Sequence, residues 1–232
     1  MQKKNSDNTL YKLFAFLFII GSLILSIHFW AFNESFYRSE HSKLTLYGKS
    51  IADHIGISES DLDELTHFTL SYLNDPNASL DLQMEVSGQM REIFTDDEKL
   101  HMIDVRNLNL AANYIGIFCL IVTIFAICHA IKKKQLPLLF SSYKKVLFYA
   151  AAILAVLGAW ILIDFDSFWT MFHHVFFPSN DLWLLDLRKD ILIMIVPPEF
   201  FNHLVITIVV TFIALLAAAY FVLKAVTAKG SL

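Results

Sequence analysis

Two segments of the sequence combine residue types that suit proton transfer. His101 is followed three residues later by Asp104, and on a helix the carboxylate would lie beside the ring and could accept from one of its nitrogens. His173 and His174 lie in an aromatic run, 172–177. Adjacent helical residues diverge by about 100°, so only one of this pair could face a shared site. Each segment taken alone is also compatible with an exposed ion pair or an interfacial anchor. Two imidazoles meeting at one site could act as general acid and base.

Other chemistries find less support in the residue patterns. A metal site built on these histidines would need further ligands, for which the candidates are Asp104, His174, Asp166 and Asp181. No HExxH or comparable motif supplies them. With only 7 glycines there is no phosphate-binding loop, and no GxSxG motif marks a covalent nucleophile. We therefore expect neither a metal nor a cofactor, and no nucleic-acid partner.

The elements that must position these histidines include four membrane spans. The chain is 56% apolar and 17% charged, whereas a soluble domain is about 45–50% apolar and about 25% charged. Four windows carry no charge, and each approaches or exceeds the roughly 20 residues that a helix needs to cross a bilayer. These windows are residues 13–32, 108–131, 146–163 and 204–223. The fold class predicted is an all-α integral membrane protein with four transmembrane helices.

The charge distribution predicts how the chain is oriented in the cell membrane. Residues 33–107 contain 15 Asp/Glu and 6 Lys/Arg, and residues 164–203 contain 6 and 2. The short remaining segments, 1–12, 132–145 and 224–232, are basic. Because basic short loops stay in the cytoplasm, both termini and the 132–145 loop are predicted inside. Both histidine segments are then extracellular, and so is the site they would form.

The first outer segment, 33–107, is expected to fold as a helical cap. Apolar residues recur at helical spacing over 57–73, where Ser58 or Ser60 can cap the helix. Thr95 and Glu98 form a capping box, and nothing interrupts the helix that follows until residue 131. This helix would carry His101 above the membrane and continue directly into the second span.

The second outer segment, 164–203, is predicted to be an interfacial aromatic loop. It contains nine Phe and Trp residues, and such rings collect at the membrane–water boundary. The apolar run 191–196 is too short to span, and Pro197 and Pro198 end it. We expect short helices that lie in, or dip into, the outer interface.

Two motifs within these segments resemble the signatures of a known family. The first is the run FTDDEKLHMIDVRNL at 94–108, and the second begins with FWTMFHHVFF at 168–177 and continues to Phe201. They fall in the order, and on the predicted outer face, of the lipoprotein intramolecular transacylases of Gram-positive bacteria.

The resemblance implies an acyltransferase acting on lipoproteins that carry a diacylglyceryl group. The acyl chain esterified at the middle glycerol carbon would pass to the α-amine of the N-terminal cysteine, giving a lyso-form lipoprotein. The family's two catalytic histidines would fall on His101 and His173, with His174 the less favoured neighbour. The protein need not supply a nucleophile, because the amine and the ester belong to one substrate.

Supporting residues follow from the needs of that reaction. Asp104 would orient His101, and donors to the oxyanion could come from Asn180, Trp183, Arg106 or backbone N–H groups. The aromatic residues that would seat the lipid part of the substrate are Trp169, Phe172 and Phe176.

Two other functions are compatible with the same sequence. One is a non-catalytic membrane module that binds a partner through its acidic cap, in which case the histidines should not matter. The other is a metal-dependent lipid hydrolase. Membrane lipid surrounds the chain under all three hypotheses.

Overall fold

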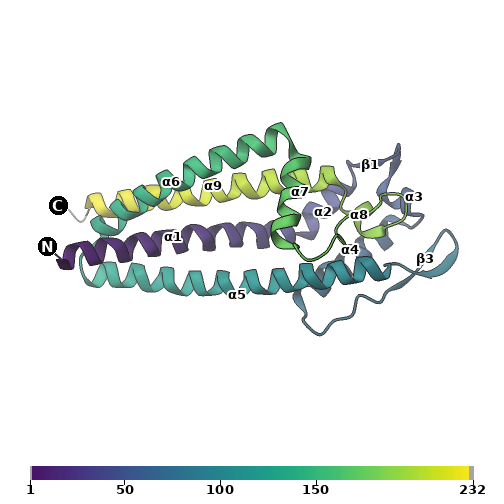
Figure 1. Cartoon of the computed structure of the whole chain (residues 1–232), viewed down its shortest axis with the longest axis horizontal. Coiled ribbons are helices and arrows are strands. Elements are labelled where there is room, and N and C mark those ends of the chain that lie inside the picture. The colour runs from purple at the N-terminus through teal and green to yellow at the C-terminus, as the bar shows by residue number, and fades with distance from the viewer. Residues whose placement is uncertain (1, 230–232) are drawn as a thin grey trace. The chain divides into compact units, whose positions relative to one another are not determined.

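The computed structural model describes residues 2–229, which form nine helices and two short β-hairpins (Figure 1). The helices are α1 Gln2–Ala31, α2 Glu34–His41, α3 Ile51–Ile55, α4 Glu59–Asn74, α5 Asp96–Lys132, α6 Leu136–Ile163, α7 Phe165–Phe176, α8 Ile191–Ile195 and α9 Pro198–Lys229. The strands are β1 Thr45–Leu46, β2 Lys49–Ser50, β3 Gln83–Val86 and β4 Gln89–Glu92. This mostly helical architecture with four long apolar helices confirms the predicted fold class.

The chain divides into two compact units, which we call the bundle unit and the cap unit. The bundle unit consists of Met1–His28, Ala112–Phe168 and Thr207–Leu232. The cap unit consists of Phe29–Ala111 and Trp169–Ile206.

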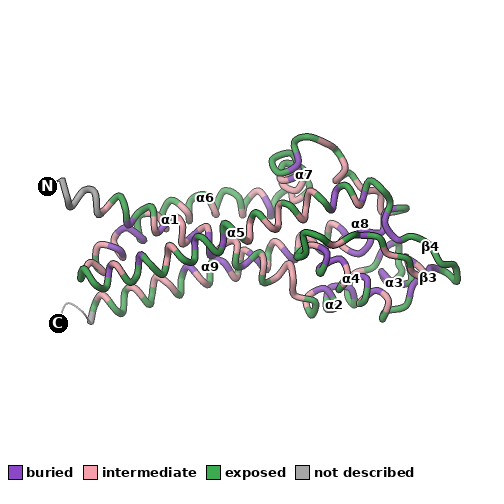
Figure 2. Tube along the Cα trace, turned by 90° about the horizontal axis from the view of Figure 1, so that it is seen from below, coloured by how far each residue is buried: buried purple, intermediate pink, exposed green. Residues whose placement is uncertain are grey.

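The bundle unit is built from the apolar parts of α1, α5, α6 and α9, which run side by side (Figure 1). All four helices are long and apolar enough to cross a membrane. Large apolar side chains on them are exposed, for example Ile163 at 84% and Phe148 at 71%. In Figure 2 these helices are exposed or half-buried over most of their length. A lipid environment accounts for such surfaces, because acyl chains solvate them as well as protein does.

Close packing in the bundle unit depends on small residues and a few polar contacts. A Cβ atom added at Gly21 of α1 would lie 2.9 Å from the Cβ of Cys119 on α5. The Tyr143 hydroxyl donates to the carbonyl of Leu216 at 2.7 Å, and the Tyr11 hydroxyl donates to Gln135 Oε1 at 2.9 Å. Small residues that let helix backbones approach are typical of membrane helix interfaces.

The cap unit has an apolar core of its own. Ile51, Leu62, Leu65 and Ile191 are nearly or completely buried in it, and Figure 2 shows buried residues along α4 and α8. The helix predicted over 57–73 is α4, and the expected Ser58 cap is present as a capping box with Asp61. The uninterrupted helix predicted after Thr95 is α5.

Two features of the cap unit differ from the sequence-based expectations. The cap is not entirely helical, because it contains the antiparallel hairpins β1–β2 and β3–β4. Both hairpins turn through two residues with positive φ, of which the second is a glycine, as in Ser87 and Gly88. The 191–196 run was expected at the membrane interface, but α8 packs instead into the core of the cap unit. Its apolar residues are therefore buried in protein.

Candidate active site

His101 lies in the second turn of α5, in the cap unit, and is 7% exposed. The predicted capping box sets where this helix begins: Thr95 N and Oγ1 donate to Glu98 Oε2 at 2.7 and 2.9 Å, and Glu98 N donates to Thr95 Oγ1 at 3.3 Å. The uncharged run of α5 begins at Leu108. At about 1.5 Å per residue, His101 lies about 10 Å before that run and outside the membrane-spanning segment.

The Glu98 side chain also fixes the segment that follows α7. It is completely buried, and its Oε1 accepts a hydrogen bond of 2.7 Å from Leu192 N in α8. Burial raises the pKa of this carboxyl, while the three hydrogen bonds it accepts oppose that shift. From the sequence, Glu98 could be recognised only as a cap; its long-range contact with α8 was missed.

His173 lies on α7 and is 6% exposed. Its Nδ1 is 2.8 Å from the carbonyl oxygen of Trp169. Since a carbonyl can only accept, Nδ1 carries the proton, and Nε2 of the neutral ring keeps its lone pair. The ring stacks on Trp183, with centroids 4.7 Å apart and planes 23° from parallel.

The fold of the cap unit brings the two imidazoles together. The ring centroids of His101 and His173 are 6.3 Å apart, and Phe177 contacts both rings, at 5.3 and 5.8 Å. Phe177 is buried and was not among the predicted site residues. The signal for it is the second of the two phenylalanines that end the aromatic run. His174 is exposed and its ring meets Trp183 edge-on, so it is not part of the buried pair.

Burial favours the neutral form of both imidazoles. Burial lowers the pKa of His101 to about 4, and the nearby His173 ring adds to this effect. Burial also lowers the pKa of His173, and the hydrogen bond to Trp169 partly offsets it. A neutral ring with a free lone pair can accept a proton, so the pair suits acid–base chemistry.

Two of the four residues predicted to support the pair, Asp104 and Asn180, bond each other. Asp104 does not bond His101: its Oδ2 accepts from Asn180 Nδ2 at 3.0 Å, while Asn180 Oδ1 accepts from Leu182 N at 3.2 Å. The predicted orienting hydrogen bond is therefore wrong, because the loop after α7 supplies a competing donor. The charge of Asp104 still acts on His101, whose pKa it raises slightly against the effect of burial.

Arg106 is engaged away from the imidazoles. Its Nη1 donates to the carbonyl of Ala78 at 2.7 Å, and its guanidinium lies 4.5 Å from the ring centroid of Tyr72. It therefore secures the turn after α4.

Two buried polar atoms at the imidazole pair have no hydrogen-bond partner in the described part of the chain. They are His101 Nδ1 and Trp183 Nε1. Buried donors and acceptors in native proteins are nearly always paired, so these two atoms are candidates to meet a substrate.

The aromatic residues predicted to bind substrate form a wall beside His173. The ring centroids of Trp169 and Phe172 lie 4.8 and 5.4 Å from that of His173. The two aromatic rings also stack on each other, with centroids 5.1 Å apart. Phe176 contacts Phe172 at 4.8 Å and is 48% exposed. Phe201 extends the wall by packing on Trp169 at 4.3 Å.

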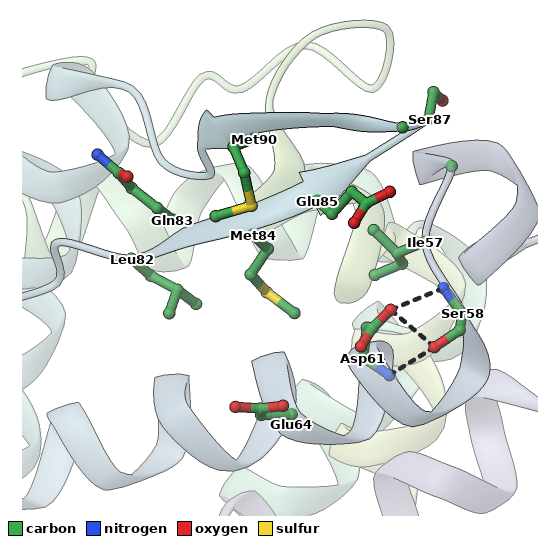
Figure 3. A pocket seen from close by; sticks show the side chains of 12 residues that line it. Ile57, Ser58, Asp61, Glu64, Leu82, Gln83, Met84, Glu85, Ser87 and Met90 are labelled. Atoms are coloured by element: carbon green, nitrogen blue, oxygen red, sulfur yellow. Dashed lines mark hydrogen bonds between the residues drawn. The ribbon is translucent and has the colours of Figure 1, made fainter.

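A hollow in the cap unit, separate from the imidazole pair, is acidic and lacks histidine. It has a volume of about 560 Å³ and lies between the β3–β4 hairpin and the start of α4 (Figure 3). Asp61, Glu64 and Glu85 are among its lining residues. Among residues 2–229, no group of three or more His, Cys, Asp or Glu side chains is arranged to hold a metal ion.

Comparison with known proteins relates nearly the whole chain to one family. The family model for the lipoprotein intramolecular transacylase Lit matches residues 12–201. A solved structure of the membrane integral lipoprotein intramolecular transacylase Lit from Bacillus cereus is similar, with a TM-score of 0.75 and 20% identity, over 97% of this chain and 99% of that chain.

Two variants of the Bacillus cereus protein, with one histidine replaced by arginine or by alanine, are also similar. They match with TM-scores of 0.71 and 0.73, at 20% and 18% identity, over 98% of this chain and 95% and 97% of theirs. Comparison with curated protein sequences gave no match. The range matched by the family model contains both imidazoles of the buried pair.

Proposed function

This chain belongs to the lipoprotein intramolecular transacylase family, and from that premise we propose that it converts diacylglyceryl-modified lipoproteins to the lyso form. As a member of this family it is a multi-pass membrane acyltransferase with lipoprotein substrates. The α-amine of the N-terminal cysteine attacks the ester carbonyl at the middle glycerol carbon. The new C–N bond forms as the C–O bond breaks, and one proton moves from nitrogen to the released glycerol oxygen.

The single observation that carries this proposal is the buried pair of imidazoles, 6.3 Å apart between ring centroids. An α-amine has a pKa of about 7.7–8.0, so the nitrogen must lose a proton during attack. His173 is the base in this scheme, because the Trp169 carbonyl holds its Nδ1–H and leaves the Nε2 lone pair available. The proton then passes to the glycerol oxygen, and His101 stabilises that oxygen as it leaves.

Trp183 is the side-chain donor that we assign to the tetrahedral oxyanion. Of the three predicted candidates, Asn180 is engaged by Asp104 and Leu182, and Arg106 by the turn after α4. Trp183 Nε1 is buried and has no partner in the described part of the chain, and the indole stacks on His173. Asp104 and Asn180 act as positioning residues, since their hydrogen bond ties α5 to the loop that carries Trp183.

The aromatic wall accounts for how a lipid-anchored substrate would be held. Trp169, Phe172 and Phe176 offer apolar faces beside the base, where acyl and glyceryl groups can pack. Holding the amine and ester in line can contribute about 7–11 kcal/mol to the rate, without a protein nucleophile.

The active site is proposed to face the outside of the cell. Residues 33–107 and 164–203, which supply the site, are acidic, whereas 132–145 contains five lysines and no acid. Short basic loops are retained in the cytoplasm, which orients the remaining segments outward.

Mass spectrometry of the N-terminal lipopeptide tests this function. With the active chain, one acyl group should move from ester to amide at unchanged lipopeptide mass. His101→Gln and His173→Gln should abolish the change, whereas His174→Gln, at the exposed neighbour, should leave it largely intact.

The same measurement separates the two other hypotheses. A lipid hydrolase would lower the mass by one acyl group. A non-catalytic module would leave the lipopeptide unchanged, and its partner binding would depend on the acidic hollow, so a D61N/E64Q/E85Q variant would lose it (Figure 3).

A further inference from the structure

A second hollow, in the bundle unit, has a lining unlike that of the active site. It has a volume of about 740 Å³ and is formed by α1 and α6. Its lining combines cations, a hydroxyl and rings, contributed by Lys12, Ser141, Lys144, Lys145, Phe148 and Tyr149. We propose that this lysine pocket binds the phosphate headgroup of an anionic membrane lipid.

The positions of the lysines along their helices set the depth of the pocket. Lys12 directly precedes the apolar run 13–32 of α1, and Lys145 directly precedes the run 146–163 of α6. Both helices therefore present cations at the point where the hydrocarbon-spanning segment begins. Lipid phosphates lie in the layer just outside the hydrocarbon core, which is the layer these lysines reach.

Within the described residues, no carboxylate neutralises the charge of the pocket. All three lysines are exposed, and none forms an ion pair with a carboxylate within the described residues. Residues 132–145 contain no acid at all. Lys144 Nζ lies 4.9 Å from the ring centroid of Phe140. A phosphodiester would supply the missing negative charge.

The part of the pocket that lies further along the apolar run of α6 suits acyl chains. Phe148 and Tyr149 lie one turn further into the apolar run and are 71% and 69% exposed, so their rings are not used in packing the bundle. A soluble phosphate would contact only the lysines and Ser141. A lipid would contact these groups and also the rings, so the pocket as a whole fits a lipid.

Native mass spectrometry of the full chain can measure lipid retention. The chain is released from detergent micelles that contain equal amounts of phosphatidylglycerol and phosphatidylcholine with the same acyl chains. The wild-type chain should retain phosphatidylglycerol in preference. A lysine near an anionic headgroup contributes about 1 kcal/mol, or roughly fivefold, so the K12Q/K144Q/K145Q variant should retain it on the order of 100-fold less strongly.

A matched variant separates a built pocket from diffuse positive charge. K132Q/K133Q/K134Q removes the same charge from the adjoining loop, outside the pocket, and should leave retention within about twofold of wild type. Equal losses in the two triple variants would overturn the proposal, as would no preference for phosphatidylglycerol in the wild-type chain.

Two further arms address folding and the source of the phosphate. K12R/K144R/K145R keeps the charge and should keep the lipid, so its loss in this variant as well would contradict the proposal. Excess glycerol 3-phosphate should not displace the lipid. Displacement would show a site for a free anion instead. None of these readouts depends on transacylation.

Discussion

The carboxylate of Glu98 is predicted to hold the active-site loop in place, and its removal should be costly. In the Glu98→Ala variant, the N–H groups of Thr95 and Leu192 lose an acceptor that each now reaches at 2.7 Å. Leu192 is buried, whereas Thr95 is exposed and water can replace its lost acceptor. An unsatisfied buried donor costs about 1–3 kcal/mol, so the Leu192 N–H alone should lower the free energy of unfolding by about that amount. Release of a buried charge offsets part of this, which places the expected loss at about 1–2 kcal/mol.

Glu98→Gln provides the matched comparison, because it keeps the size and one carbonyl acceptor. It should cost less than Glu98→Ala, since one of the two N–H groups remains bonded. Both variants should lower turnover, because α8, which follows the loop bearing Asn180 and Trp183, is then held less firmly against α5. Unfolding of the purified protein in mixed micelles measures the stabilities. If the Glu98→Ala and Glu98→Gln variants are both as stable as wild type, Glu98 does not anchor this loop.

Three further predictions concern other contacts. Trp183→Phe keeps a ring stacked on His173 but removes the indole N–H. The value of kcat should therefore fall about 10²–10³-fold, by the same factor at every pH, while KM stays unchanged. A shifted pH profile would show instead that the indole acts by changing the pKa of His173. Burial lowers the pKa of His101 to about 4, so the unfolded chain binds more protons than the folded one between pH 4 and 6.5. The free energy of unfolding should therefore fall by up to about 3 kcal/mol as the pH drops through that range. His101→Gln should flatten this profile, and an unchanged slope would exclude His101 as its source. Gly21→Ala places a methyl 2.9 Å from Cys119 Cβ and should destabilise the bundle by about 1–3 kcal/mol, whereas Gly158→Ala, with nothing within 4 Å, should not; equal effects would refute the packing argument.

The long helices could be predicted because their signals are local. Uncharged runs identify the four apolar helices, and the Thr95–Glu98 capping box marks the start of α5. Burial of α8 in the cap unit could not be predicted in this way, because a short apolar run has the same residue pattern whether protein or lipid covers it. The hairpins were missed because their strands are only two or four residues long, too short for alternation to show.

The candidate site could be predicted only in part from the sequence, because the residues that contact its histidines come from distant parts of the chain. Helical spacing correctly places Asp104 near His101, yet it cannot reveal that Asn180 competes for the carboxylate. Likewise, spacing alone does not choose between His173 and His174; the choice follows from burial against His101 and Phe177. Local patterns identified the reactive side chains, and tertiary packing determined their partners.

The central claim is that His101 and His173 serve one proton transfer as a unit, and a double-mutant comparison of turnover tests it most directly. The rate of ester-to-amide conversion is measured for wild type, His101→Gln, His173→Gln and the double variant, with folding verified for each. Residues that act together are strongly non-additive, so the double variant should be about as slow as the slower single variant. Multiplied losses in the double variant, or near-wild-type turnover in either single variant, would contradict the claim.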